Sequence, residues 1–240
     1  MMRVISAAIA FALASAAVAD EGAIRRMIEG KLPGAKVQSV QKLPVSGLYE
    51  VVVAARDGPA VYYVDDKATA IFVGDIFEAK SGRNITEERK RKLSAIRWDS
   101  LPFEWAVTSK RGDGRRKIAI FSDPNCPFCK RFEKDLAKLD DITIHIFLYP
   151  VIKQQSVTLT RSVWCSKDRA KAWDDLMLRD IQPAAAPDCE TPIQQIVELG
   201  RKLGAKSTPT WFLENGDRHQ GANPLAEVTR LLDAASPAKR

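Results

Sequence analysis

The feature that most constrains this chain is a Cys-x-x-Cys pair, Cys126 and Cys129, at the junction of an expected strand and an expected helix. Residues 117–121 are short, apolar and rich in β-branched side chains, which predicts a buried strand. After the pair, apolar side chains recur every three or four residues as far as Leu139, which predicts an amphipathic helix with Glu133 mostly off its apolar face. This context favours a redox site over a zinc-binding turn.

The local geometry predicts different chemistry for the two cysteines. Pro127 suits the first position of a helix, which makes Cys126 the expected N-cap. Its sulfur would face free backbone N–H groups and the positive end of the helix dipole, and both favour the nucleophilic thiolate. Since Pro127 leaves few side-chain donors nearby, we expect the backbone to supply most of this stabilisation. Cys129, one turn further and on the apolar face, would be less exposed and placed to attack a mixed disulfide formed at Cys126.

Two simpler interpretations of the pair are a structural disulfide and half of a zinc site. Zinc needs four ligands at characteristic spacings, whereas Cys165 and Cys189 are far apart and the only histidines are His145 and His219. We therefore predict no metal site, and we expect both histidines to be satisfied or solvent-facing. A structural bond between residues three apart would close too small a loop to stabilise much.

Length and charge limit the other function classes. The 240 residues can form one large domain or two small ones. The net charge of +7 is modest and spread along the chain, without a dense basic block interleaved with aromatics, so we predict no nucleic-acid partner. The most basic run, residues 87–92, opens with two acids and is typical of a solvated helix face.

Residues 1–19 are predicted to be a cleaved secretory signal. Arg3 gives a positive start, residues 4–18 are apolar, and Ala17-Val18-Ala19 predicts cleavage after Ala19. The segment is short for a membrane anchor. We therefore expect an exported, soluble mature protein, and four cysteines suit an oxidising compartment.

The remaining chain is expected to form an α+β protein in three parts, namely residues 20–79, 80–102 and 103–240. The first part would be a small module at the lower limit of a self-sufficient core, which pairing with a second copy through its edge strands would stabilise. The second is polar and would hold a linker helix over residues 85–98. Strands are expected at residues 36–41, 48–54, 60–64, 70–73, 103–107, 117–121, 142–148 and 210–213, a hairpin turn at 214–217, and helices at 20–31, through most of 156–203, and at 225–234.

Three segments carry a resemblance to a known family: residues 123–130 around the Cys-x-x-Cys, residues 163–176 around Cys165, and Ser207-Thr208-Pro209. With the alternating strands and helices, they resemble the thioredoxin fold with a helical insertion. The exported chain, with a small N-terminal module and a linker helix, resembles the DsbC/DsbG family of bacterial periplasmic disulfide isomerases.

The resemblance implies specific roles. It makes Cys126 the attacking thiol, Cys129 the resolving thiol, Pro209 a cis-proline facing the site, and Thr208 a backbone partner for bound peptide. It implies a second, structural disulfide between Cys165 and Cys189. It also implies a periplasmic homodimer that pairs through residues 20–79, uses no cofactor beyond its dithiol, acts on misoxidised or unfolded exported proteins, and is kept reduced by a membrane reductase of the DsbD type.

Two details leave the branch of the family open. Pro127-Phe128 between the cysteines is more similar to the DsbG branch, whereas the Cys165 and Cys189 pair is similar to DsbC. The main hypothesis is a thiol:disulfide interchange protein that rearranges or reduces incorrect disulfides. The alternatives are a dithiol oxidase of the DsbA type, and a DsbG-like holdase chaperone or reductase of single-cysteine clients.

Overall fold

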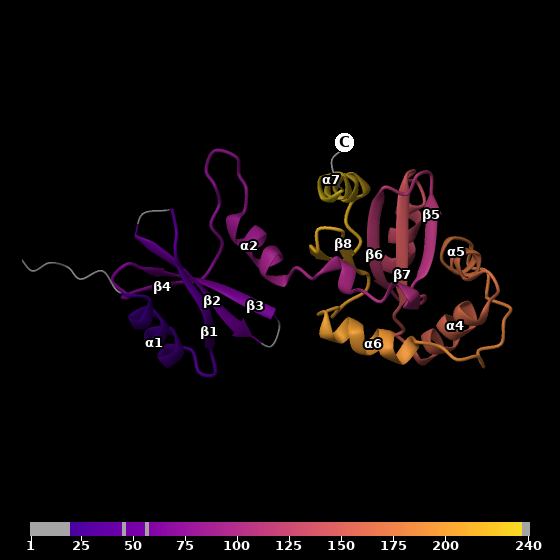
Figure 1. Cartoon of the computed structure of the whole chain (residues 1–240), viewed down its shortest axis with the longest axis horizontal. Helices are drawn as coiled ribbons and strands as arrows, with labels where there is room; N and C mark the ends of the chain where they lie inside the picture. Colours follow the sequence, from indigo (N-terminus) through magenta and orange to yellow (C-terminus); the bar gives the residue numbers. More distant parts are fainter. Residues whose placement is uncertain (1–19, 45–46, 56–57, 237–240) are drawn as a thin grey trace, which may run out of the picture. The chain divides into compact units, whose positions relative to one another are not determined.

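A computed structural model describes residues 20–44, 47–55 and 58–236. The expected signal sequence lies outside these residues. The chain divides into two compact units between Lys90 and Arg91. Both units combine helices with a sheet, so the predicted α+β class is confirmed (Figure 1).

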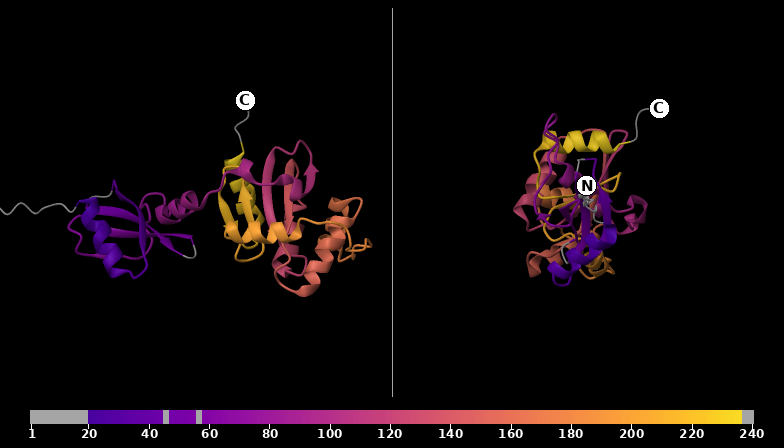
Figure 2. Two further views of the ribbon diagram at one scale, coloured as in Figure 1. Left: turned by 60° about the horizontal axis from the view of Figure 1, so that its bottom comes forward. Right: turned by 90° about the vertical axis from the view of Figure 1, so that its left-hand side faces the viewer.

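In the described part of the first unit, α1 packs on an antiparallel sheet in which each strand pairs with the next along the chain (Figures 1 and 2). The elements are α1 (Glu21–Lys31), β1 (Lys36–Lys42), β2 (Leu48–Ala55), β3 (Gly58–Asp65) and β4 (Ile71–Phe72). Ile24 and Ile28 are fully buried in one core with Val51 of β2, because their spacing places both on one helical face. The last strand is two residues shorter than predicted. Its Phe72 is exposed, and so are Val73 and Phe77 after it.

Helix α2 (Ile85–Ser94) begins where predicted but ends four residues early. After α2, the N–H of Ile96 does not continue the helix but donates to the carbonyl oxygen of Gly216 at 3.0 Å. Gly216 has φ +86, and a Cβ there would lie 2.1 Å from the carbonyl oxygen of Ile96. The chain then continues as two short 3-10 turns, η1 (Trp98–Ser100) and η2 (Phe103–Trp105), so the predicted strand at residues 103–107 is wrong.

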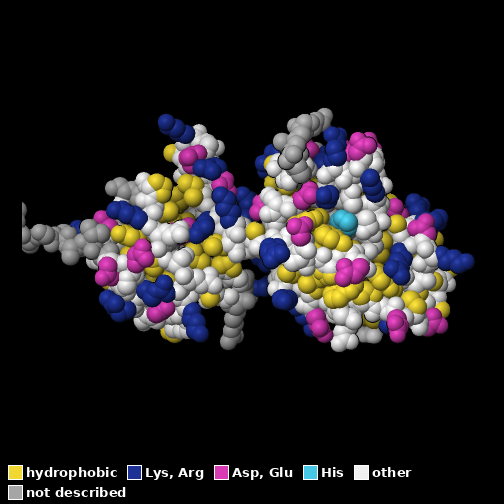
Figure 3. Space-filling view, in the orientation of Figure 1, with side chains coloured by type: hydrophobic (Ala, Val, Ile, Leu, Met, Phe, Trp, Pro, Cys, Tyr) yellow, Lys and Arg dark blue, Asp and Glu magenta, His cyan; other side chains and the backbone are white. Residues whose placement is uncertain are grey.

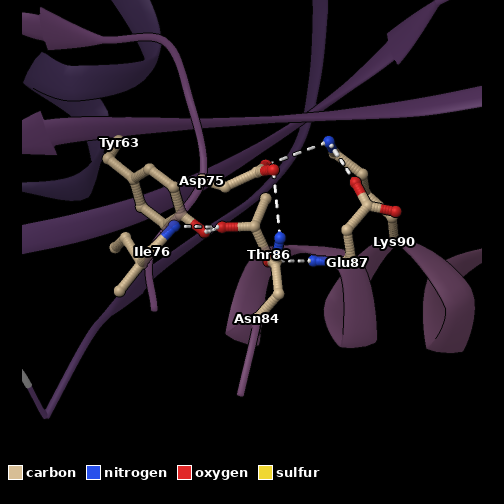
Figure 4. Close-up of polar contacts among 7 residues, drawn as sticks. All are labelled: Tyr63, Asp75, Ile76, Asn84, Thr86, Glu87 and Lys90. Carbon is tan, nitrogen blue, oxygen red and sulfur yellow. Dashed lines mark hydrogen bonds and ion pairs between the residues drawn. The ribbon is translucent and has the colours of Figure 1, made fainter. Parts of the chain in front are cut away.

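A buried hydroxyl joins the start of α2 to the sheet of the first unit (Figure 4). Asn84 caps the helix by accepting from the N–H of Glu87 at 2.9 Å. Thr86 is fully buried, and its Oγ1 bonds the hydroxyl of Tyr63 at 2.5 Å and accepts from the N–H of Ile76 at 2.8 Å. Thr86 therefore satisfies the buried hydroxyl of Tyr63 and the partly buried N–H of Ile76.

This network predicts the cost of removing one oxygen. Thr86→Val keeps the shape of the side chain but leaves Tyr63 and Ile76 unpaired, so it should lower the free energy of unfolding by about 1–3 kcal/mol. Thr86→Ser keeps the hydroxyl, loses only a methyl group, and should cost clearly less. Urea titrations of both variants test this, and equal losses would contradict the role given to the hydroxyl.

The second unit is built on a mixed sheet with the order β5-β7-β6-β8-β9. Its strands are β5 (Val107–Arg111), β6 (Arg116–Ser122), β7 (Ile142–Leu148), β8 (Thr210–Leu213) and β9 (Arg218–Gln220). The two strands β6 and β7 are parallel and the other pairs are antiparallel. In Figure 1, β5, β6 and β7 stand upright, with α7 at their upper left and α4 and α6 below.

The helices of the second unit are α3 (Pro127–Leu136), α4 (Gln154–Cys165), α5 (Arg169–Arg179), α6 (Ile193–Lys202) and α7 (Leu225–Ala235). The helical signal predicted through most of residues 156–203 is interrupted between α5 and α6. There Asp180 ends α5 with a left-handed φ of 57, and prolines at 183, 187 and 192 disfavour continued helix. The hydrophobic core of the second unit includes the fully buried side chains of Phe121, Phe132 and Trp211.

Candidate active site

The site is built on the loop that leads from β6 into α3, and the carboxylate of Asp123 organises this loop. Asp123 is fully buried. Its Oδ1 accepts from the N–H of Asn125 and the hydroxyl of Ser156, both at 2.8 Å. Its Oδ2 accepts from the N–H groups of Val151 and Ile152 at 2.7 and 2.8 Å. This carboxylate therefore fastens the loop before Cys126 to the segment that follows β7.

Cys126 lies at the N-cap of α3, with Pro127 at the start of the helix. Its side chain is 4% exposed, and its thiol donates to the carbonyl oxygen of Thr208, with 3.2 Å between sulfur and oxygen. The pKa of Cys126 is lowered from 9.0 to about 5. The largest cause is a hydrogen bond from the Cys129 thiol. Burial opposes it, and the side chain of Thr208 and the backbone N–H groups of Cys129 and Phe128 lower the pKa further.

The order of these causes corrects one expectation. The sequence predicts that the backbone carries most of the thiolate stabilisation, whereas here the partner thiol contributes most. Cys129 lies one turn along α3, where its thiol can act on the Cys126 sulfur. Cys129 itself is fully buried, and its pKa is raised, first by burial and then by its contact with Cys126. Both cysteines are free thiols, of strongly different acidity.

Thr208 and Pro209 lie beside this pair, just before β8. The peptide bond between them is cis. Thr208 is 8% exposed, and its carbonyl oxygen is the group that contacts the Cys126 thiol. The Thr208 hydroxyl has no conventional hydrogen-bond partner among the described residues. The structure therefore brings Cys126, Cys129, Thr208 and Pro209 together at one end of the sheet.

Apolar side chains are exposed close to the dithiol. Phe128, between the cysteines, is 55% exposed, and Val151 and Ile152, held by Asp123, are 42% and 49% exposed. Ile181 is also exposed, next to Asp180, which pairs with Lys130 of α3. Figure 3 shows hydrophobic side chains gathered across the lower part of the second unit. Such exposed apolar groups are available to contact another polypeptide.

Sequence reasoning missed two groups behind the dithiol. Glu133, predicted to lie mostly off the apolar face of α3, is only 6% exposed, and its Oε1 accepts from the indole Nε1 of Trp173 at 3.2 Å. Ser122, the last residue of β6, is fully buried. The signal for Glu133 was its position four residues after Cys129, which places both side chains on one helical face.

Cys165 and Cys189 are disulfide-bonded in the structure, with Cα atoms 5.8 Å apart. The bond joins the last residue of α4 to the segment between α5 and α6 that lacks helix. Arg161 of α4 donates to the carbonyl oxygens of Pro187 and Cys189 in the same segment. These contacts hold the segment between α5 and α6 against α4. The Cys165–Cys189 disulfide is not among the contacts described around Cys126.

Neither histidine contacts the dithiol. His145 bonds Thr108 at 2.9 Å and packs on Phe103, and burial lowers its pKa to about 4. His219 stacks on Trp211, and burial lowers its pKa as well. Its Nε2 is buried without a hydrogen-bond partner among the described residues, so the expectation of a satisfied or solvent-facing histidine is wrong here. Within the described residues, no cluster of three or more His, Cys, Asp and Glu side chains is arranged to hold a metal ion. In the same part of the chain, no helix combines the length and apolar character needed to cross a membrane.

Two family models match the chain. Residues 103–236 match a thioredoxin-like domain, and residues 15–87 match the N-terminal domain of disulfide bond isomerase proteins. A chain with this fold and a Cys-x-x-Cys dithiol at the N-terminus of α3 is a thioredoxin-like thiol:disulfide oxidoreductase.

Known relatives agree with this class. A probable thiol:disulfide interchange protein DsbC from Bordetella parapertussis is 38% identical over 210 residues, which are 88% of this chain and 73% of that protein. The DsbC of Escherichia coli K12 is 27% identical over 222 residues, 90% of this chain and 89% of that protein. The crystal structure of a disulfide interchange protein from Neisseria gonorrhoeae, 32% identical, covers 57% of this chain and 100% of its own, with a TM-score of 0.55. This chain belongs to the DsbC family of thiol:disulfide interchange proteins.

The raised pKa of the buried Glu133 carboxyl group predicts how the stability of the protein depends on pH. Burial raises the pKa of Glu133 from 4.5 to about 7, so the folded protein retains a proton that the unfolded chain releases between these values. Glu133→Gln cannot titrate. The free energy of unfolding of this variant should equal that of the wild type below about pH 4.5. Above pH 7 it should be higher than that of the wild type by about 3 kcal/mol.

Urea titrations at a series of pH values measure this difference. Glu198→Gln, a change at an exposed carboxyl on α6, is the matched control and should show no such divergence. A constant difference between Glu133→Gln and the wild type across the pH range would contradict the raised pKa.

Proposed function

We propose that this protein rearranges and reduces incorrect disulfides in exported proteins, with Cys126 as attacking thiolate and Cys129 as resolving thiol. The observation that carries the proposal is the difference in acidity between them. Cys126 is the helix N-cap, with its pKa lowered to about 5, so it is ionised at neutral pH, whereas Cys129 is fully buried and its pKa is raised.

In the first step, the Cys126 thiolate attacks one sulfur of a substrate disulfide. A bond forms between Cys126 and that sulfur, the substrate S–S bond breaks, and its other sulfur leaves as a thiolate. The exposed backbone of a bound peptide would pair with Thr208, whose carbonyl oxygen already faces the Cys126 sulfur.

The mixed disulfide then has two fates. A substrate thiolate can attack the bound substrate sulfur, which makes a new substrate disulfide and returns Cys126 as thiolate, so the net result is isomerisation. Alternatively, Cys129 can attack Cys126, which releases a reduced substrate and leaves an oxidised Cys126–Cys129 pair. The second fate consumes two electrons, so repeated action requires a reductant, for which a membrane reductase of the DsbD type is the proposed donor.

The proposal extends to assembly and compartment. The match of residues 15–87 to a disulfide isomerase N-terminal domain supports a homodimer formed through the first unit. Phe72 of the short strand β4, with Val73 and Phe77 after it, presents exposed apolar groups that such pairing would cover. The charge and cleavage pattern of residues 1–19 supports export to the periplasm, with cleavage after Ala19.

A holdase activity is a second candidate. The exposed apolar side chains of Phe128, Val151 and Ile152 beside the dithiol would contact unfolded chains without any chemistry. A Cys126→Ser/Cys129→Ser double variant that still suppresses aggregation of an unfolded protein would separate this activity from disulfide interchange.

The proposed roles predict different phenotypes for the two single variants. Cys126→Ser removes the attacking sulfur, so it should reduce rearrangement of scrambled ribonuclease to the uncatalysed rate. Cys129→Ser should still form mixed disulfides and accumulate them, because only substrate thiols can then release Cys126. Ribonuclease activity and non-reducing electrophoresis measure both effects, and full rearrangement by Cys126→Ser would refute the mechanism.

A further inference from the structure

Phe128, the second residue between the two cysteines, is an exposed aromatic side chain to which the reaction described above gives no role. It lies in the first turn of α3 and is 55% exposed. A large apolar side chain in solvent is informative when it lies beside a reactive group, because covering it with a bound molecule is favourable. Phe128 is two residues after Cys126, the sulfur that would receive the substrate.

Arg131 supports one side of the Phe128 ring. It lies three residues further along α3, a spacing that places both side chains on one face of the helix. Its guanidinium carbon is 5.4 Å from the centre of the ring, within the range of a cation–π interaction. None of the described acidic side chains forms an ion pair with Arg131. Its positive charge therefore acts on whatever approaches the ring.

The guanidinium group of Arg131 is held in turn by a segment bonded to the cis-proline. Its Nη2 donates to the carbonyl oxygen of Ala222 at 3.3 Å. The N–H of the preceding Gly221 donates to the carbonyl oxygen of Pro209 at 2.8 Å. These bonds connect the Phe128 ring, through Arg131, to the segment beside the reactive sulfur.

The exposed apolar surface of the second unit is concentrated at the dithiol. Among the described residues of this unit, the large hydrophobic side chains that are exposed are Phe128, Val151, Ile152 and Ile181. Asp123 bonds the backbone of the second and third of these, and the ion pair between Lys130 and Asp180 holds the segment that carries the fourth. The surface around the dithiol is therefore suited to contact an apolar segment of another polypeptide.

We propose that the Phe128 ring binds the substrate residue next to the cysteine that Cys126 attacks, and that it selects an aromatic or aliphatic side chain over a basic one. Adjacent Cα atoms are about 3.8 Å apart, so this substrate residue reaches the first turn of α3 once its cysteine is bonded to Cys126. An apolar side chain covers the free side of the ring, whereas a lysine or arginine meets the like charge of Arg131. Phe128 thus determines specificity and Arg131 positions the ring. This inference rests on the role proposed above for Cys126.

Peptides of the form Gly-X-Cys-X-Gly, with the cysteine blocked as a mixed disulfide with thionitrobenzoate, test this selectivity. The Cys126 thiolate attacks the peptide sulfur, a disulfide forms between Cys126 and the peptide, and the coloured thionitrobenzoate leaves with the electron pair of the broken bond. X is Phe, Ala or Lys, and the reduced full-length protein is in excess. Each rate is divided by the rate of the same peptide with dithiothreitol, which removes differences in intrinsic reactivity.

In the wild type, the Phe peptide should react about three- to tenfold faster than the Ala peptide, and the Lys peptide should react more slowly than both. Phe128→Ala should bring the ratio of the Phe and Ala rates to about one, and Phe128→Tyr should keep the preference because it keeps the ring. Arg131→Gln should lower the preference for Phe and remove the discrimination against Lys.

The matched control is Arg201→Gln, which removes an exposed arginine on α6 and should keep the wild-type ratios. A substitution that changes only the fold or the acidity of Cys126 would alter the rates of all three peptides together and leave their ratios unchanged.

The outcomes separate this inference from the proposed mechanism. Equal rates for the three peptides in the wild type, or an unchanged preference in Phe128→Ala, would overturn the selectivity while the dithiol mechanism stands. An unchanged discrimination in Arg131→Gln would overturn the role of Arg131. Colour release by the wild type that is no faster than by Cys126→Ser would overturn the mechanism and the selectivity together. Loss of the preference in Phe128→Ala, with its retention in Phe128→Tyr and Arg201→Gln, supports the inference.

Discussion

The carboxylate of Asp123 is the interaction on which the site depends. Its two oxygens accept four hydrogen bonds, from Asn125, Ser156, Val151 and Ile152, within a fully buried environment. Hydrogen bonds to an ionised group are stronger than those between neutral groups, and a buried carboxylate without them would be very unfavourable. The loop into α3 and the segment after β7 are therefore held to each other, and this fixes where the helix begins.

The position of the helix start then determines the chemistry of the dithiol. Cys126 occupies the N-cap, where backbone N–H groups and the thiol of Cys129 favour its thiolate. Cys129, one turn deeper, lies in the core, where burial disfavours ionisation. One short helical segment thus provides a ready nucleophile and a protected second thiol.

The sequence allowed much of this arrangement to be predicted because the informative signals are local. The strand at residues 142–148, the N-cap at Cys126 and the hairpin turn at 214–217 follow from periodicity, from Pro127 and from turn residues. The pairing of Cys165 with Cys189 and the site-facing position of Thr208 depended on the family resemblance, since both join segments distant in sequence.

The features that were missed depend on tertiary contacts. Helix α2 ends early because Ile96 bonds to Gly216, more than a hundred residues later in the chain. Glu133 looked like a surface residue because a glutamate on a helix is usually solvated, and only the packing of α5 places Trp173 over it. The hydrogen bonds of Asp123 to the segment after β7 join residues distant in sequence, so they could not be inferred from sequence spacing.

The most direct test of this account is the rate at which each cysteine of the reduced native protein reacts with iodoacetamide as pH is varied, read by mass spectrometry of the labelled peptides. The account predicts that Cys126 is labelled with a midpoint near pH 5 and that Cys129 stays unlabelled until the protein unfolds. Equal labelling of both thiols with a midpoint near 9, the ordinary value for a cysteine, would contradict it.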